Sequence, residues 1–505
     1  MGIPSYYKKL IDNIPGLITK EQKVDWLFMD FNCLIYHCLY RDDTPIYPGN
    51  LLKDKWENQF IDCIITYCLK VIKEVSPTVG VFIAIDGVVP MAKMRQQRLR
   101  RFKSVWAEKS ENTKWDKNAI TPGTHFMAKL KLGLEHMIST HENWMLSSSD
   151  EPGEGEHKIM AEWRKGIYKG NYAIYGLDAD LIVLSMLGHE CCNLNNIWLF
   201  REEMNAGKIT YDSFGEEIFN WFSINALKKW LATKCTLKRS FILNYCFALS
   251  ILGNDFLPSS LGLKMRDDGH AELLDIIISI TSKNIQLVDT NTYNISFEGI
   301  KELFRILLMN EPHRICKYIN KKQMFANNAE ELKLGENNWP LSHIEESILL
   351  ENRKMCHKWQ DKYHTFFNGF NIDIICKEYL YGIQWIWSYY IGRDVCFNWY
   401  YPHNLPPLWQ WISSYLTTNK LPVEDVLIKA TDITTFEQLS LVLPLESWSL
   451  IPDCLERNLP LLAPQYFPTV FSFESIGKRY FWECETIIPL PSILEIKELV
   501  KLTFV

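Results

Sequence analysis

Carboxylates follow four apolar runs that are short enough to be strands, and one more follows a strongly apolar helical stretch. The seven acids are Asp30, Asp86, Glu154, Glu156, Asp178, Asp180 and Asp255. In an open α/β sheet, ligands bind beyond the carboxyl ends of the strands, so we expect these acids to converge on one edge. Like charges gathered there repel unless cations neutralise them, and carboxylate oxygens suit Mg²⁺ or Mn²⁺. Two such ions form the usual clamp for displacement at phosphorus, which predicts a metal-dependent phosphodiesterase.

A single Asp after a strand is more often the N-cap of the next helix, and this interpretation fits any one of these acids taken alone. Seven acids together reverse that preference. Gly155 lies between two of the glutamates and leaves room for a closely approaching group. The sequence has no cluster of His, Cys or Ser that competes as a nucleophile site, and it has no Walker A loop. A phosphate-transferring nucleotide hydrolase is therefore disfavoured.

A cation-rich stretch at residues 91–109 begins just after Asp86 and is expected to be helical. At about 100° per residue, one face of this helix collects four polar side chains, while Arg95 and Arg98 turn away. The positive N-terminal end of the helix adds to its attraction for anions. A basic helix alone is more often a solvated face, but its place beside Asp86 favours a phosphate pocket. The four residues of that face are Lys93, Gln97, Arg100 and Arg101.

Over about the first 200 residues, short apolar runs alternate with longer amphipathic stretches. This pattern predicts a mostly parallel sheet covered by helices, which would position the residues above. The expected strands are residues 26–30, 79–86, 144–148, 172–177 and 197–200, and the expected helices are 51–75, 91–109, 125–139 and 154–165. Residues 205–265 have a helical pattern, including an apolar helix at 240–252. The polar stretch 310–345 suggests a connector, which places a domain boundary near 340.

The composition is that of a globular protein, with 505 residues, 47% of them hydrophobic and 23% charged. A formal net charge of −6 gives no global attraction for polyanions, so a nucleic-acid site must be a local patch. The N-terminus lacks the pattern of a secretory signal, and no stretch is apolar enough to span a membrane, so we expect a cytoplasmic protein without a membrane partner. The 14 cysteines form no C-x-x-C pair, which disfavours a zinc site.

Together, the motifs resemble the XRN family of 5′→3′ exoribonucleases, which shares its PIN-like nuclease core with flap endonucleases. The matching pieces are MGIPSYYKKL at 1–10, MDFN at 29–32, AIDGVVPMAKMRQQRLRRF at 84–102, PGEGEHKIM at 152–160, YGLDADLIVL at 175–184 and LGNDFLP at 252–258. The PGEGEHK and GNDFLP pieces separate this family from flap endonucleases. Weaker similarity at 398–403 (NWYYPH), 436–444 (FEQLSLVLP) and 477–491 (GKRYFWECETIIPLP) is typical of the family's second conserved region.

The resemblance implies an α/β nuclease domain at 1–340 and a mostly helical second conserved region at 341–505 that completes the active-site channel. It assigns the same seven acids to two Mg²⁺ ions, for which Mn²⁺ can substitute, and the same four residues of the basic helix to a 5′-monophosphate pocket. The family's base-stacking Trp corresponds to Trp399. Its stacking His corresponds to Tyr36, with His37 one residue further on, and a buried core Tyr is an equally good interpretation of Tyr36.

The implied activity is processive degradation of single-stranded RNA from a 5′-monophosphate to nucleoside 5′-monophosphates, in mRNA decay downstream of a decapping activity. The compact length suits a viral or divergent eukaryotic member. Two alternatives remain open on the residues alone. One is a structure-specific 5′ flap endonuclease acting on DNA, because the acid cluster is shared. The other is a non-catalytic protein that binds RNA 5′ ends, although a binding protein has no need for a costly cluster of like charges.

Overall fold

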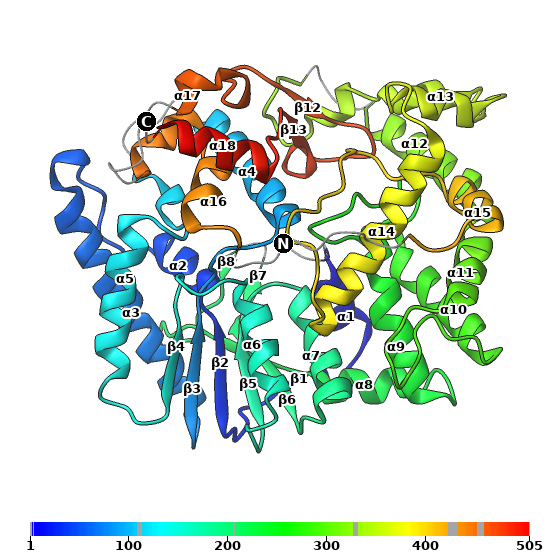
Figure 1. The fold of residues 1–505 in the computed structure, drawn as a ribbon. Helices are drawn as coiled ribbons and strands as arrows, with labels where there is room; N and C mark the ends of the chain where they lie inside the picture. The colour runs from blue at the N-terminus through cyan, green and yellow to red at the C-terminus, as the bar shows by residue number, and fades with distance from the viewer. Residues whose placement is uncertain are drawn as a thin grey trace.

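The computed structural model describes residue 3 and residues 5–108, 114–205, 208–326, 332–422, 432–451 and 459–503. Its centre is a seven-stranded sheet with the strand order β1-β9-β6-β5-β2-β3-β4 (Figure 1). The five strands from β6 to β4 are mutually parallel, whereas β9 and β1 join one edge antiparallel. The strands are β1 (Ile18–Thr19), β2 (Trp26–Asp30), β3 (Gly80–Ala84), β4 (Trp144–Ser147), β5 (Tyr172–Tyr175), β6 (Ile197–Glu202) and β9 (Phe219–Ser223).

Helices cover both faces of the sheet, because successive side chains of a strand point to opposite faces. In β2, Leu27 and Met29 join a core with helices α2, α3 and α5, while Phe28 between them joins a core with α6 and α7. These helices are α2 (Phe31–Leu39), α3 (Lys53–Val75), α5 (His125–Ile138), α6 (Gly155–Arg164) and α7 (Asp180–Cys192). The continuous apolar runs of the strands thus reflect burial on both sides.

Further helices extend the chain beyond the antiparallel edge of the sheet (Figure 1). They are α1 (Tyr6–Asn13), α8 (Ile224–Ala232), α9 (Lys238–Leu249), α10 (Gly269–Ser282), α11 (Phe297–Met309), α12 (Glu311–Ala326), α13 (Trp359–Thr365), α14 (Ile372–Ile391) and α15 (Trp409–Thr418). Helix α14 packs on α7 and α15, and α15 packs on α11. One hydrophobic core therefore runs from the sheet into the residues after 340.

The last segments of the chain lie beside the cation-rich helix α4 (Met91–Glu108), above the sheet in Figure 1. Both α16 and β13 pack directly on α4, and α18 packs on α16. These elements are α16 (Thr435–Val442), α17 (Leu459–Leu462), α18 (Ile493–Thr503), β12 (Ser472–Glu474) and β13 (Glu485–Ile487). The small hairpins β7 (Met204–Asn205) with β8 (Lys208–Ile209), and β10 (Leu350–Glu351) with β11 (Lys354–Met355), complete the strands.

One expectation about the middle of the chain is wrong. Residues 205–265 are not all helical, because β8 and the sheet strand β9 lie there before α8 and α9 begin. The polar stretch 310–345, expected to be a connector, contains helix α12 at residues 311–326. Its buried side, which includes Ile315 and Ile319, recurs at a helical spacing that the surrounding Asn and Lys residues conceal.

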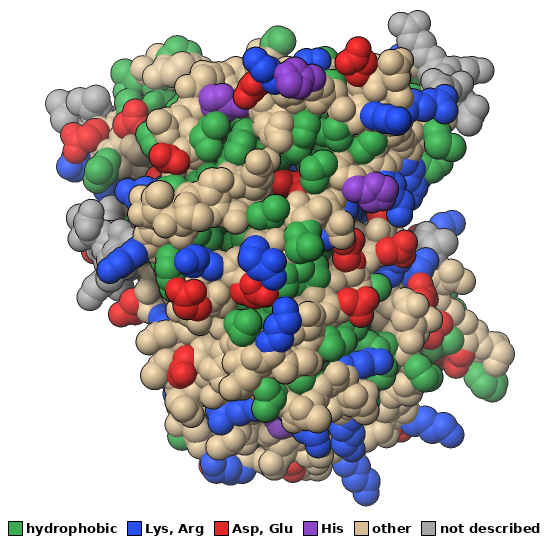
Figure 2. All heavy atoms as spheres, turned by 90° about the vertical axis from the view of Figure 1, so that its right-hand side faces the viewer, with side chains coloured by type: hydrophobic (Ala, Val, Ile, Leu, Met, Phe, Trp, Pro, Cys, Tyr) green, Lys and Arg blue, Asp and Glu red, His purple; other side chains and the backbone are tan. Residues whose placement is uncertain are grey.

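The surface formed by the helices at the right of Figure 1 mixes acidic, basic and apolar side chains rather than presenting one sign of charge (Figure 2). Among the helices that the structure describes, none is both long enough and apolar enough to cross a bilayer. The cysteines of the described residues are all free. The charge of this face therefore does not indicate an anion-binding site.

Candidate active site

The predicted acids converge at the carboxyl ends of four neighbouring strands, β5, β2, β3 and β4. Asp30 is the last residue of β2, and Asp86 follows β3 by two residues. The two pairs come from the segments after β4 and β5, where α6 and α7 begin, and Asp255 comes from the loop after the 3₁₀ turn Ser250–Leu252. A cavity of about 790 Å³ is lined by six of the seven acids. The seventh, Asp180, is buried, and its Oδ1 has no hydrogen-bond partner among the described residues.

The turn around Gly155 lies against two of the acids, Asp30 and Asp86. The Gly155 N–H donates to Asp86 Oδ1 at 2.7 Å, and the Asp86 N–H donates to Asn32 Oδ1 at 3.0 Å. A Cβ on residue 155 would lie 2.6 Å from Asp30 Oδ1, which is closer than such atoms approach. The group for which glycine leaves room is therefore the Asp30 carboxylate.

Crowding of these carboxylates changes their affinities for protons. Burial, followed by repulsion from Asp86 and Asp178, raises the pKa of Asp30 well above its usual range. Burial and the neighbouring Asp178 raise the pKa of Asp180 to about 7. Burial and Asp180 likewise raise the pKa of Glu156. The cluster is therefore short of positive charge, as a site for bound cations is expected to be.

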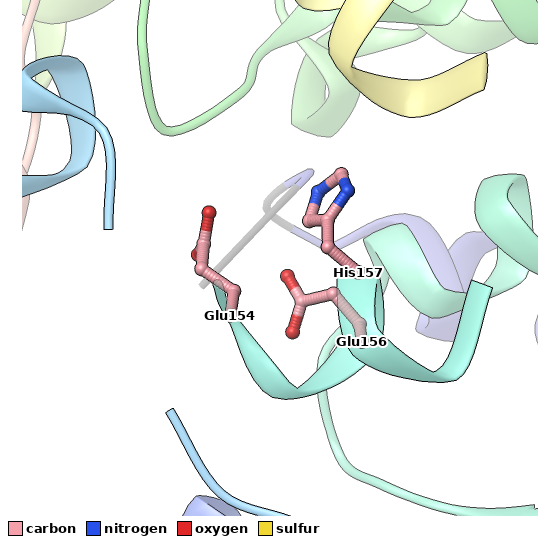
Figure 3. Close-up of side chains that lie close together, drawn as sticks. All are labelled: Glu154, Glu156 and His157. Atoms are coloured by element: carbon pink, nitrogen blue, oxygen red, sulfur yellow. The ribbon is translucent and has the colours of Figure 1, made fainter. Parts of the chain in front are cut away.

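Glu154 and Glu156 meet His157 at the first turn of α6 (Figure 3). One potential ligand atom from each of the three residues lies within 4.8 Å of the other two. Tyr389 of α14 donates to Glu154 Oε1 at 2.9 Å, and its ring stacks on the His157 ring at 3.6 Å. Burial lowers the pKa of His157 well below its usual range, so its imidazole is neutral at pH 7. The second conserved region thus fixes this acidic turn.

Lys93 provides the one cation bonded into the acid cluster in the described part of the chain. Its Nζ lies 2.6 Å from Glu154 Oε2 and 2.8 Å from Asp255 Oδ2. Burial lowers the pKa of Lys93, but attraction to Asp255 and Glu154 outweighs burial and raises it well above its usual value. The same attraction overcomes the effect of burial on Asp255 and lowers its pKa to about 2. Lys93 therefore lies between the acids and the rest of the basic face.

The basic face of α4 lines the same cavity as the acids, with Lys93, Gln97, Arg100 and Arg101 on its wall. Gln97 and Arg101 are each only 5% exposed. Gln97 Oε1 and Arg101 Nη1 have no hydrogen-bond partner among the described residues. Burial lowers the pKa of Arg101 to about 10, so the guanidinium is charged at pH 7. A buried cation with an unused donor, turned to a cavity, is suited to an anionic ligand.

The two arginines expected to turn away from this face do so, and they attach α4 to the second conserved region. Arg98 is fully buried and donates to the carbonyl oxygens of Leu441 at 2.6 Å, of Pro489 at 3.3 Å and of Tyr466. Arg95 donates to Asn404 at 2.8 Å. These contacts fix α4 against residues that follow position 340 in the sequence.

The two residues expected to stack on bases lie in different surroundings. Tyr36 is half-buried on the cavity wall, so its ring is within reach of a ligand there. The adjacent His37 stacks on Tyr67 at 4.7 Å and lies 3.7 Å from a Glu217 oxygen, so protein groups already engage it. Trp399 is not brought to the cavity. It is 9% exposed and packs between Trp385 and Tyr381, and its stacking role stays a prediction.

Three residues that support the site were not predicted. Lys158 joins the ends of β3 and β4, because its buried Nζ donates to the carbonyls of Ile85 at 2.6 Å and Ser148 at 2.7 Å. Gln438 of α16 accepts from the Val89 N–H at 2.9 Å, just before α4. Tyr389 is the third. Lys158 lies inside the motif PGEGEHK and Gln438 inside the motif FEQLSLVLP, so their places in these motifs could have indicated a role at the site. No motif includes Tyr389.

Two family models match the chain on either side of residue 340. One, described as "XRN 5'-3' exonuclease N-terminus", matches residues 1–203, and the other, described as "Xrn1 helical domain", matches residues 352–503. The chain belongs to the XRN family. The acids from Asp30 to Asp180 and the whole of α4 lie in the first match, while Asp255 lies between the two.

Curated relatives agree with this membership. The chain is similar to 5'-3' exoribonuclease 1 of Homo sapiens, with 28% identity over 97% of this chain and 33% of the human protein. It is also similar to 5'-3' exoribonuclease 1 of Schizosaccharomyces pombe, with 24% identity over 97% of this chain and 47% of that protein. With 5'-3' exoribonuclease 2 of Candida glabrata, the identity is 30% over 55% of this chain and 35% of the relative. The chain spans less than half the length of these relatives.

Proposed function

We propose that this XRN-family chain is a 5′→3′ exoribonuclease that degrades single-stranded RNA from a 5′-monophosphate and releases nucleoside 5′-monophosphates. The observation that carries the proposal is a single cavity lined both by six of the acids and by the four polar residues of α4. An anchor for one phosphate thus lies beside a cluster suited to cleaving the next. The names of the relatives, which are 5'-3' exoribonucleases, support the same activity.

The donor set fits Mg²⁺, the ion that we propose for the site. Carboxylate oxygens are the ligands that hard divalent cations prefer, and Mn²⁺ shares this preference. The unpartnered Asp180 Oδ1 and the raised pKa values of Asp30 and Glu156 are also what a site for cations requires. The seven acids would hold two ions. When bound, such a pair activates water and stabilises the leaving oxygen in an in-line displacement at phosphorus.

The chain's own residues hold and orient the strand in this proposal. Arg100 and Arg101 donate to the terminal phosphate, since guanidinium groups bind phosphate oxygens with two parallel hydrogen bonds. The resemblance to the family implies a pocket for one phosphate only, so we expect RNA with a triphosphate or a cap to be excluded. Tyr36 offers a ring face to a leading base, which holds a strand without reading its sequence. The strand then advances by one nucleotide after each cleavage.

A time course on RNA labelled at its 3′ end tests the proposal. The RNA carries a 5′-monophosphate, a 5′-hydroxyl, a triphosphate or a cap, and each is incubated with Mg²⁺ or with EDTA. We expect Mg²⁺-dependent loss of the monophosphate RNA alone, without discrete intermediates. The Asp178→Asn variant should bind this RNA without degrading it, whereas Asp12→Asn, an exposed carboxylate of α1, should behave as the parent. Degradation by Asp178→Asn at the parental rate would overturn the assignment of the acids.

The same assay separates the alternatives. Internal cleavage that is indifferent to the 5′ end, together with cutting of a 5′-flap DNA, would favour a structure-specific endonuclease. Binding without cleavage would favour an RNA 5′-end scaffold. A role in cytoplasmic mRNA decay, downstream of a decapping activity that supplies monophosphate ends, is part of the proposal. A fluorescent C-terminal fusion and transcript half-lives measured with and without Asp178→Asn would test it.

A further inference from the structure

A second cavity, of about 220 Å³, adjoins the candidate active site. Its walls come from a neighbouring side of α4, the loop after residue 252, the 3₁₀ turn Met265–Asp267, and residues 477–485. Arg100 and Asp255 line both cavities. The two cavities therefore share part of their walls.

The second cavity carries an excess of unpaired positive charge. It has four carboxylates, and each already pairs with a cation: Asp255 with Lys93, Asp267 with Lys321, Glu483 with Arg266, and Glu485 with Arg95. Of these pairing cations, only Arg266 lines the cavity. The other lining cations make no ion pair with a carboxylate of the described residues, and they are Arg100, Lys103, Lys264, Lys478 and Arg479. This balance attracts an anion.

Lys264 is the most constrained of these cations. Its Nζ donates to Ser259 Oγ at 3.1 Å, a neutral partner. Burial and the neighbouring Lys478 lower the pKa of Lys264 to about 7. Lys103 is similar, because its Nζ donates to the Cys484 carbonyl oxygen at 2.7 Å and burial lowers its pKa to about 8. Cations held in low dielectric without an opposite charge are costly, and an anion between them removes that cost.

An aromatic surface lies at the same cavity. Trp482 is 50% exposed, and its ring is nearly parallel to that of Tyr480, with an interplanar angle of 11°. The Arg266 guanidinium lies over both rings, 4.8 Å from the centre of Tyr480 and 5.5 Å from that of Trp482. An exposed Trp beside cations is the combination that binds a nucleobase and its phosphate together.

We propose that the second cavity binds a nucleoside 5′-monophosphate, with the phosphate between Lys264 and Lys478 and the base against Trp482. The identification of this ligand with the released product rests on the proposed function, because a 5′→3′ exonuclease forms that product on the other side of Arg100. The cavity would then receive each nucleotide before it leaves the enzyme. Binding of the nucleotide itself is independent of RNA cleavage.

Calorimetric titration with UMP tests the proposal, using Asp178→Asn protein with and without a bound 5′-monophosphorylated RNA oligonucleotide. We expect UMP to bind equally well in both states, because the RNA occupies the first cavity. Lys264→Gln and Trp482→Ala should each weaken UMP binding about tenfold or more, since each removes a charged or a stacking contact. Neither should change the affinity for RNA. Lys478→Gln provides a second charge variant, and Lys234→Gln, an exposed lysine that lines neither cavity, is the matched control.

Three results would overturn the inference. Competition between UMP and the RNA would place the nucleotide in the first cavity. Unchanged UMP affinity in Lys264→Gln and Lys478→Gln would remove the phosphate site. Equal binding of inorganic phosphate and UMP, with no effect of Trp482→Ala, would leave only a general anion site. RNA degradation by the parent protein is measured separately, so failure of the proposed function and failure of this inference give different results.

Discussion

Replacing Arg101 with Met should reduce the preference for 5′-monophosphate RNA without unfolding the protein. Arg101 is 5% exposed, and its Nη1 has no hydrogen-bond partner among the described residues, so the side chain contributes little to stability through that atom. A hydrogen bond to a charged group is worth about 1.5–3 kcal/mol. At roughly 1.4 kcal/mol for each factor of ten, kcat/KM for the monophosphate RNA should fall by about 10- to 150-fold.

The assay compares kcat/KM for two RNAs that differ only in a 5′-monophosphate or a 5′-hydroxyl. Arg101→Met should lose rate mainly on the monophosphate RNA, and its melting temperature should be no lower than that of the parent, because an unpaired buried charge is costly. Lys234→Gln is the matched control, since Lys234 is an exposed cation that lines neither cavity. Equal loss on both RNAs, or an undiminished preference for the monophosphate, would refute the assignment of Arg101 to the phosphate pocket.

Three further predictions concern stability. Arg98→Met leaves three carbonyl oxygens without their donor, so the free energy of unfolding in urea should fall by at least ~3 kcal/mol. Burial raises the pKa of Glu311 from 4.5 to about 7, so the folded state binds the proton of this carboxyl more tightly than the unfolded state does. The free energy of unfolding should therefore fall by on the order of 3 kcal/mol as the pH rises from 4.5 to 7. The Glu311→Gln variant should lack this decrease. Mg²⁺ should raise the melting temperature, and EDTA should reverse this increase. In the Asp180→Asn variant, the increase caused by Mg²⁺ should be smaller.

The strands and helices of the first 200 residues could be predicted because local patterns determine them. The expected strand 26–30 is β2, and the expected helix 125–139 is α5 to within one residue. Convergence of the acids followed from the order of strands and helices, since a parallel sheet places the ends of its strands at one edge. The helical spacing of residues in α4 likewise predicted that Arg98 points away from the face that we propose to bind phosphate.

The unpredicted features depend on contacts between distant parts of the chain. The strand β9 was not predicted because its sequence, FNWFS, lacks the regular alternation of apolar and polar residues that marks a strand. Its extended conformation depends on pairing with β6. Tyr389 reaches Glu154 across 235 positions of sequence, a distance over which no spacing rule applies. Trp399 was matched by motif alone, and the motif did not reveal that Trp385 and Tyr381 would pack on its ring.

The site needs both conserved regions for a physical reason. Six of the seven acids lie at or just after the ends of strands, so the sheet itself brings them together. Helix α4 instead carries many positive charges and borders a cavity, so it needs other contacts to hold it there. Three sets of contacts hold it in place: Phe397 accepts from the Met91 N–H at 2.7 Å, Gln438 accepts from Val89, and the second region's carbonyls receive Arg98. The proposed phosphate pocket requires α4 to lie beside the acids, and the contacts with residues after 340 hold it there. The helical second region is therefore part of the active site although it supplies none of the seven acids.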